Sequence, residues 1–257
     1  MDLKLQDKWF IVCGASSGFG KSIATRLVEE GANVVAIARR KEFLERLKQV
    51  SPDQVRTFAG DITRSQTIKA LFNETQDIKL SGIVFNAGGP PAMSFKETSM
   101  DDWDKAYHQL VRWKIELAKA FLPRFERLNQ GRYLFLESAS VKQPIENLVL
   151  STSLRLSVVG MMKTLAQEIP DSGITFNMLA PGYHQTNAVD RLIKKKAEVD
   201  NSSYTEARYQ IEQGIPTGKM GQPDDLATLA VWLLSPWSSY ITGQIFPVDG
   251  GTIRSTL

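Results

Sequence analysis

Short apolar runs alternate with helical stretches along most of the chain, and this alternation constrains the fold more than any other feature. Residues 9–13 form a continuous apolar run, which is typical of a strand covered on both faces. A helix is predicted over 18–30, and Gly31 stands at the position of its C-terminal cap. Further strands are predicted at 33–38, 54–59, 82–85, 132–136, 174–179 and 244–248, and further helices at 43–50, 64–75, 101–128, 151–169 and from 223 onwards.

The regular alternation predicts the α/β fold class. Helices that connect parallel strands cross over in the right-handed sense and cover both faces of the sheet. We therefore expect residues 1–257 to form a single doubly wound domain around a mostly parallel, seven-stranded sheet. No stretch resembling a linker interrupts the alternation.

The region 183–218 departs from the alternation. It is polar, carries three consecutive lysines at 194–196, and is too long for an ordinary connection. A substrate lid within the domain is one interpretation of this region. A solvent-exposed helix that carries the lysine run explains the composition equally well.

Composition narrows the classes of function. Apolar residues make up 42% and charged residues 23% of the 257 residues, as in globular proteins, and the net charge of +3 gives little reason to expect a nucleic-acid partner. The single cysteine, Cys13, excludes an internal disulfide, and with only two histidines we expect no metal site. No apolar run is long enough to span a membrane and no signal peptide is visible, so a cytoplasmic protein without a membrane partner is expected.

A glycine-rich turn follows the first predicted strand and opens the first predicted helix. Glycines at this place let the backbone turn tightly and let a pyrophosphate approach the amides of the helix N-terminus, whose dipole favours anions. A plain strand-to-helix turn is the alternative. The segment reads Gly14, Ala15, Ser16, Ser17, Gly18, Phe19, Gly20.

Together with four later segments, this turn makes the chain resemble the classical short-chain dehydrogenase/reductase family over nearly its whole length. The resemblance implies a Rossmann-like fold, in which Asp61 and Ile62 contact the adenine of a dinucleotide and 86–88 contact its adenosine side. It also implies that residues after the sixth strand border the nicotinamide. The four segments are Gly60-Asp61-Ile62, Asn86-Ala87-Gly88, Pro181-Gly182 with Thr186, and Asp249-Gly250-Gly251.

The end of the second predicted strand bears on the choice of cofactor. An acidic side chain there would bind a free ribose 2′-hydroxyl and repel a 2′-phosphate, but this strand is followed by Arg39 and Arg40. Guanidinium groups suit a phosphate because they form forked, charge-assisted hydrogen bonds. NADP(H) is therefore favoured over NAD(H), which stays possible. The alternative is that both arginines only begin the next helix.

The chain departs from the family at the positions that handle protons. The family carries a Tyr-x-x-x-Lys pair, a serine 13 positions before the tyrosine, and an asparagine on the preceding long helix. The serine is present as Ser138, but Ser151 and Arg155 stand at the pair, and Leu110 stands at the asparagine position. A serine hydroxyl is far less acidic than a phenol, and a positioned acid or base contributes ~10²–10⁴-fold in rate.

Another residue could supply the proton. His184 and Tyr183 directly follow Pro181-Gly182, and the imidazole of His184 titrates near neutral pH. The alternative is that both form the wall of a substrate pocket. Glu137 and Tyr107 are weaker candidates.

The sequence leaves two functions open. The first is an NAD(P)(H)-dependent oxidoreductase that transfers a hydride to or from a small carbonyl, imine or activated double-bond substrate. The second is a catalytically silent dinucleotide-binding subunit or sensor that partners an active relative. The family resemblance implies a homodimer or homotetramer that assembles through two long helices.

Overall fold

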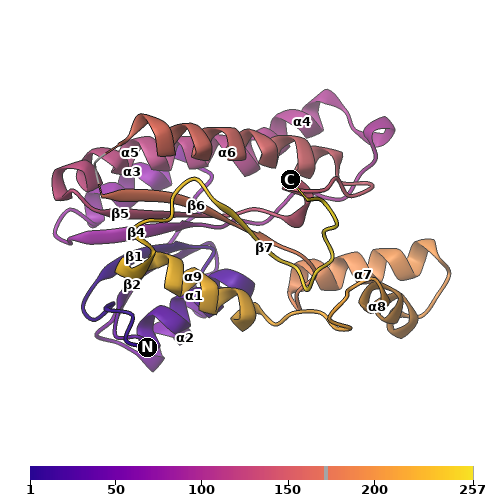
Figure 1. Ribbon diagram of the computed structural model, residues 1–257, viewed down its shortest axis with the longest axis horizontal. Coiled ribbons are helices and arrows are strands. Elements are labelled where there is room, and N and C mark those ends of the chain that lie inside the picture. The colour runs from indigo at the N-terminus through magenta and orange to yellow at the C-terminus, as the bar shows by residue number, and fades with distance from the viewer. Residues whose placement is uncertain (171–172, 257) are drawn as a thin grey trace.

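One parallel sheet organises the molecule (Figure 1). The computed structural model describes residues 1–170 and 173–256. In that part of the chain, seven strands pair in the order β3-β2-β1-β4-β5-β6-β7, and every pairing between neighbouring strands is parallel. The strands are β1 (Trp9–Cys13), β2 (Asn33–Ala38), β3 (Val55–Ala59), β4 (Leu80–Phe85), β5 (Gly131–Leu136), β6 (Ile174–Pro181) and β7 (Ile245–Val248).

Helices cover both faces of this sheet, so the predicted doubly wound α/β fold is confirmed. In Figure 1, α3, α5 and α6 lie on one side of the strands, and α1, α2 and α9 lie on the other. The helices are α1 (Gly18–Glu29), α2 (Lys41–Val50), α3 (Ser65–Glu74), α4 (Met100–Tyr107), α5 (Trp113–Leu128), α6 (Val149–Glu168), α7 (Asn187–Val199), α8 (Tyr204–Gln213) and α9 (Pro223–Leu234).

Two apolar cores result from the alternation of side chains along each strand. In β5, Tyr133 and Phe135 join the core beneath α5 and α6, whereas Leu134 and Leu136 join the core beneath α1 and α9. Both sets are buried, because successive strand residues point to opposite faces. Of the described helices, none is both long and apolar enough to cross a bilayer.

The long helix predicted over 101–128 is interrupted. A π-helical turn, His108–Arg112, separates α4 from α5. Within it, Gln109 donates from Nε2 to the carbonyl oxygens of Gly88 and Gly89, over 3.0 and 3.1 Å. The widened turn therefore holds the loop after β4, and π turns of this kind occur frequently at functional sites.

The region 183–218 forms α7 and α8, which extend beyond the end of β7 in Figure 1. The helix interpretation of the lysine run is confirmed, since Lys194, Lys195 and Lys196 lie on α7 and pair with acidic residues three or four positions away. The two helices have an apolar core of their own, formed by Val189, Ile193, Ala207, Ile215 and Met220.

Candidate active site at the carboxyl edge of the sheet

The turn between β1 and α1 has the shape of a phosphate-binding loop. Gly14 and Gly18 have φ values of +68° and +52°, a region that favours glycine. A Cβ on Gly20 would lie 2.4 Å from the carbonyl oxygen of Gly14, so the turn tolerates no side chain there. Ser17, at the N-cap of α1, makes no side-chain bond to the helix. The N-terminal amides of α1 are therefore available to an anion.

Arg40 lies over this loop. Its Nη2 donates to the hydroxyl oxygens of Ser16 and Ser17, over 3.2 and 3.1 Å, and its guanidinium carbon lies 4.2 Å from the centre of the Phe43 ring. Arg39 is exposed. A cation beside two hydroxyls and a helix N-terminus fits a ribose 2′-phosphate, so the residues present fit NADP(H).

The loops after β3 and β4 complete the nucleotide side of the site. The amide of Asn86 donates from Nδ2 to the carbonyl of Cys13 over 3.3 Å and packs against Gly14 and Gly20. Asn86 therefore braces the glycine turn, and Ala87 and Gly88 continue along the same loop. Asp61 accepts bonds from the amide and hydroxyl of Thr63. Ile62 is buried in the core beneath α3 and α5, and its contact with adenine remains a prediction.

The segment after β6 reaches the glycine turn from the other side. Pro181 ends the strand, and Gly182 donates its amide to Val248 over 2.9 Å. A Cβ on Gly18 would lie 3.6 Å from Cγ2 of Thr186, the N-cap residue of α7. The first residues of α7 therefore lie beside the phosphate-binding turn. A movement of α7 would change the surroundings of a ligand bound at this turn.

His184 is largely enclosed at this junction. Its ring meets that of Phe19 edge to face at 5.0 Å, and its Nδ1 lies 3.2 Å from the carbonyl oxygen of Gly182. Burial lowers the pKa of this imidazole below its usual value, although the Gly182 carbonyl opposes the shift. The ring therefore stays neutral at physiological pH.

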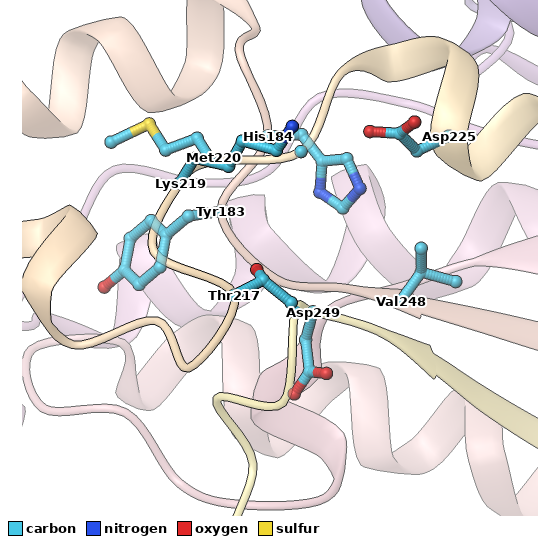
Figure 2. A pocket seen from close by; sticks show the side chains of 10 residues that line it. Tyr183, His184, Thr217, Lys219, Met220, Asp225, Val248 and Asp249 are labelled. Atoms are coloured by element: carbon cyan, nitrogen blue, oxygen red, sulfur yellow. The ribbon is translucent and has the colours of Figure 1, made fainter.

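A cavity of about 230 Å³ opens beside His184 (Figure 2). Figure 2 shows the His184 ring on the side of Asp225 and Val248, with the Tyr183 ring directed the opposite way. None of Ser138, Ser151 and Arg155 lines this cavity. In the described ranges, no hydrogen bond or ring contact joins His184 to those three residues. Within the described residues, His184 therefore shares neither this cavity nor a direct hydrogen bond with those three residues.

A buried cluster of charged side chains surrounds Ser151. Arg155 donates from Nε to Oγ of Ser151 over 3.0 Å, and from Nη1 to Oε2 of Glu137 over 2.7 Å. The other oxygen of Glu137 accepts a hydrogen bond from Lys114 on α5. All four side chains are buried, with Lys114 at 1% and Glu137 at 5% of full exposure. Ser138 accepts a bond from the amide of Ser140 nearby in the chain, at the start of the turn Ala139–Val141.

Comparison with known proteins identifies the family. The family described as "Enoyl-(Acyl carrier protein) reductase" matches residues 14–252. The chain is 27% identical over 251 residues to the NADPH-dependent reductase BacG of Bacillus subtilis (strain 168), covering 95% of this chain and 97% of that one. It is 27% identical over 256 residues to dehydrogenase/reductase SDR family member 4 of Sus scrofa, covering 96% and 88%. The chain belongs to the short-chain dehydrogenase/reductase family.

A solved structure agrees with this assignment. The crystal structure of YwfH, titled an NADPH-dependent reductase involved in bacilysin biosynthesis, matches with a TM-score of 0.92. The two chains share 25% identity over 97% of this chain and 100% of that one. As a member of the short-chain dehydrogenase/reductase family, the protein is an oxidoreductase.

Lys114 is a site residue that the sequence patterns did not single out. It lies on the apolar face of α5, one turn from Leu110 and among buried Trp113, Leu117 and Ala118. The sequence signal that could have identified Lys114 is a lysine among apolar residues on one helix face, because a charged side chain is rarely buried without a partner. Its partner Glu137 is 23 positions away in sequence and is brought near only by the packing of α5 on the sheet.

Proposed function

We propose that the protein reduces a small carbonyl, imine or activated double-bond substrate with hydride from NADPH. The observation that carries the proposal is Arg40, which donates to Ser16 and Ser17 directly above the N-terminus of α1. The names of BacG and YwfH, both NADPH-dependent reductases, support the same cofactor. The bound dinucleotide supplies the hydride.

The chain itself binds and orients the reactants. The amides of α1 hold the pyrophosphate, and Arg40 holds the 2′-phosphate. Ser138, Ser151 and Arg155 face the acceptor or the ribose hydroxyls near it. Ser151 is a poor acid at neutral pH because an aliphatic hydroxyl holds its proton more tightly than a phenol does. The proposal therefore favours acceptors that make little demand on a protein acid, such as an imine or a conjugated double bond.

The alternative of a catalytically silent subunit is not favoured, because the bacterial relative BacG is named as a reductase. A silent protein would also have no evident need for a buried set of two cations and a carboxylate beside the predicted substrate position. Burying such a set is costly, and hydrophobic residues of similar volume commonly replace it without loss of stability.

A single-turnover assay tests the proposal. Enzyme in excess is mixed with NADPH and a panel of carbonyls, imines and conjugated enones, and the loss of NADPH absorbance is followed. We expect oxidation with at least one class and slower oxidation of NADH under identical conditions. If NADPH binds but no acceptor in any class oxidises it, the proposed reduction is wrong.

We propose further that α7 and α8 act as a substrate lid. Thr186, at the start of α7, lies beside Gly18, and the two helices have a small separate core. Hydrogen exchange should be faster in 187–213 than in β1 or β4 and should slow when NADPH and an acceptor analogue bind. Hydrogen exchange in these helices that does not change on ligand binding would contradict the proposed lid.

We propose a cytoplasmic homodimer or homotetramer that associates through the outer faces of α5 and α6, where Leu156 is 44% exposed. Light scattering after size-exclusion chromatography measures the mass in solution. A single chain mass at micromolar concentration would contradict the assembly.

A further inference from the structure

The buried cluster below Ser151 carries more positive than negative charge. Glu137 is its one carboxylate, and Lys114 and Arg155 each bind a different oxygen of that group. With all three ionised, the set has a net charge of +1. This charge is fixed at the carboxyl ends of the central strands, where parallel sheets bind their ligands.

One edge of Arg155 is left available. Its Nε and Nη1 are used by Ser151 and Glu137, but Nη2 forms no hydrogen bond to any residue that the structure describes. Nη2 lies 3.0 Å from the place where a Cβ on Gly89 would stand. Because Gly89 has no side chain, this nitrogen lies close to the backbone of the loop after β4, and it is not among the fully buried polar atoms that lack a partner. Two N–H groups of a guanidinium therefore face the loop that borders the site.

We propose that Lys114, Glu137 and Arg155 act as an oxyanion-stabilising unit, with Arg155 binding the substrate oxygen and Lys114 keeping the unit positively charged. This inference rests on the proposed reductase function and narrows its substrate class to carbonyls and carbonyl-conjugated double bonds, which sets aside the imines that the weak acidity of Ser151 alone would allow. A carbonyl or a carbonyl-conjugated double bond develops negative charge on oxygen during reduction. A cationic iminium would instead be repelled by the same charge.

The step balances without a protein acid. When hydride forms the new C–H bond on the acceptor carbon, the π electron pair moves to the acceptor oxygen, which becomes an alkoxide or an enolate. Arg155 stabilises that charge through Nη2 at the moment it develops, and water then supplies the proton. Electrostatic stabilisation by a preorganised donor is commonly worth ~10²–10³-fold in kcat.

Lys114 acts through Glu137, so it is a positioning residue. If Lys114 were neutral, Glu137 would fully offset the charge of Arg155, and the unit would have no net charge. The charged or titratable groups that face Lys114 are Glu137 after β5, Arg155 on α6 and Cys13 at the end of β1. Burial lowers the pKa of Lys114 to about 8, with Glu137 opposing and Arg155 reinforcing the shift. The charge of the unit therefore changes close to physiological pH.

The test compares Lys114→Met with Lys119→Met, an exposed lysine on the same helix. In the wild type, kcat with a carbonyl or enone acceptor should fall as pH rises through about 8. Lys114→Met should lower kcat and kcat/KM together by ~10²-fold at neutral pH, with no dependence on pH across this range. Lys119→Met should follow the wild-type profile, and all three proteins should bind NADPH with equal affinity by fluorescence titration.

A second readout does not depend on turnover. NMR of protein carrying lysine isotopically labelled at Cε should show one signal that is missing in Lys114→Met. That signal should titrate near pH 8 and move to higher pH when an acceptor-derived carboxylate analogue binds beside NADP. A Lys114 signal whose titration does not move when the analogue binds would overturn the inference, because the analogue's negative charge would then lie away from the unit.

The outcomes distinguish a failure of the oxyanion-stabilising unit from a failure of the proposed reductase function. If the wild type oxidises NADPH and Lys114→Met keeps the wild-type kcat and pH profile, the oxyanion unit is wrong and the reductase stands. If Lys114→Met weakens NADPH binding without changing kcat, Arg155 serves the cofactor, and the inference also fails. If none of the acceptors in the panel causes the wild type to oxidise NADPH, the proposed reductase function is wrong.

Discussion

Arg155 and Glu137 form a buried ion pair in which Nη1 donates to Oε2 over 2.7 Å, with the Glu137 side chain fully enclosed. The pair joins α6 to the end of β5 and is completed by Lys114 from α5. Lys114 on α5 is 23 positions from Glu137 in sequence, and Arg155 on α6 is 18 positions from it. Two helices therefore bind the same carboxylate. We therefore expect the stability of this corner of the fold to depend on that single negative charge.

Glu137→Gln should strongly destabilise the protein. The substitution removes the counter-charge that Lys114 and Arg155 share, and breaking a buried ion pair in this way costs about 3–5 kcal/mol. Adding Lys114→Met should recover part of the loss, because the buried amine that has lost its partner is then removed. Urea unfolding of both single variants and the double variant measures the coupling. Strictly additive effects would show that the three charges do not act as a unit.

Stability should rise with pH just above neutrality. The folded-state pKa of Lys114 is lowered from 10.5 to about 8, so between these values the unfolded chain binds more protons than the folded one. The free energy of unfolding therefore increases by up to about 1 kcal/mol per pH unit. Burial raises the pKa of the Cys13 thiol from 9.0 to about 12, which opposes the rise above pH 9. Urea unfolding at pH 7.5–9 should show a positive slope that Lys114→Met abolishes; equal slopes would contradict the assignment.

Arg40→Ala should weaken the binding of NADPH by about 10–100-fold, the effect of losing a charge-assisted hydrogen bond to phosphate. The affinity for NADH should change little, because NADH lacks the 2′-phosphate. Arg46→Ala is the matched control, since Arg46 lies over the same Phe43 ring, at 5.1 Å, without bonding to Ser16 or Ser17. Fluorescence titration with both dinucleotides checks this. An equal loss in both arginine variants would place the 2′-phosphate elsewhere.

Gly20→Ala should abolish tight binding of either dinucleotide. The new methyl would lie 2.4 Å from the carbonyl oxygen of Gly14 and 2.8 Å from Nδ2 of Asn86, so the turn must deform. Overpacking of this kind also costs about 1–3 kcal/mol of stability. Gly160→Ala has no atom within 4 Å of the added Cβ and should leave NADPH affinity unchanged. Calorimetric affinities that agree between the two variants would contradict the proposed loop.

The fold was predictable from the sequence because its signals are local. Apolar runs such as 9–13 mark buried strands, and the glycines of the first turn are needed by backbone geometry that a Cβ would block. The π turn at His108–Arg112 was not predictable, because one extra residue per turn barely disturbs the apolar periodicity of the flanking helices. The two helices of 183–218 were only half anticipated, since polar faces and a lysine run also suit a loop.

The site residues that sequence position and motif define were predictable. The residues that enter the site only through the packing of helices on the sheet were not. Arg40 was expected to suit a cofactor phosphate from its place after β2, and the structure brings it onto the hydroxyls of Ser16 and Ser17. Ser151 and Arg155 were predicted as site residues from their place in the family pattern, and the structure shows that Arg155 donates to Ser151. Lys114 was missed, because only the packing of α5 against the end of β5 shows that it meets Glu137.

Calorimetric titration of the purified protein with NADPH, and separately with NADH, tests the central claim of a 2′-phosphate-selective dinucleotide site most directly. The account predicts saturable heat with one dinucleotide bound per chain, and at least tenfold tighter binding of NADPH, on the order of 1.4 kcal/mol. The absence of heat with both, or equal affinity for the two, would contradict it.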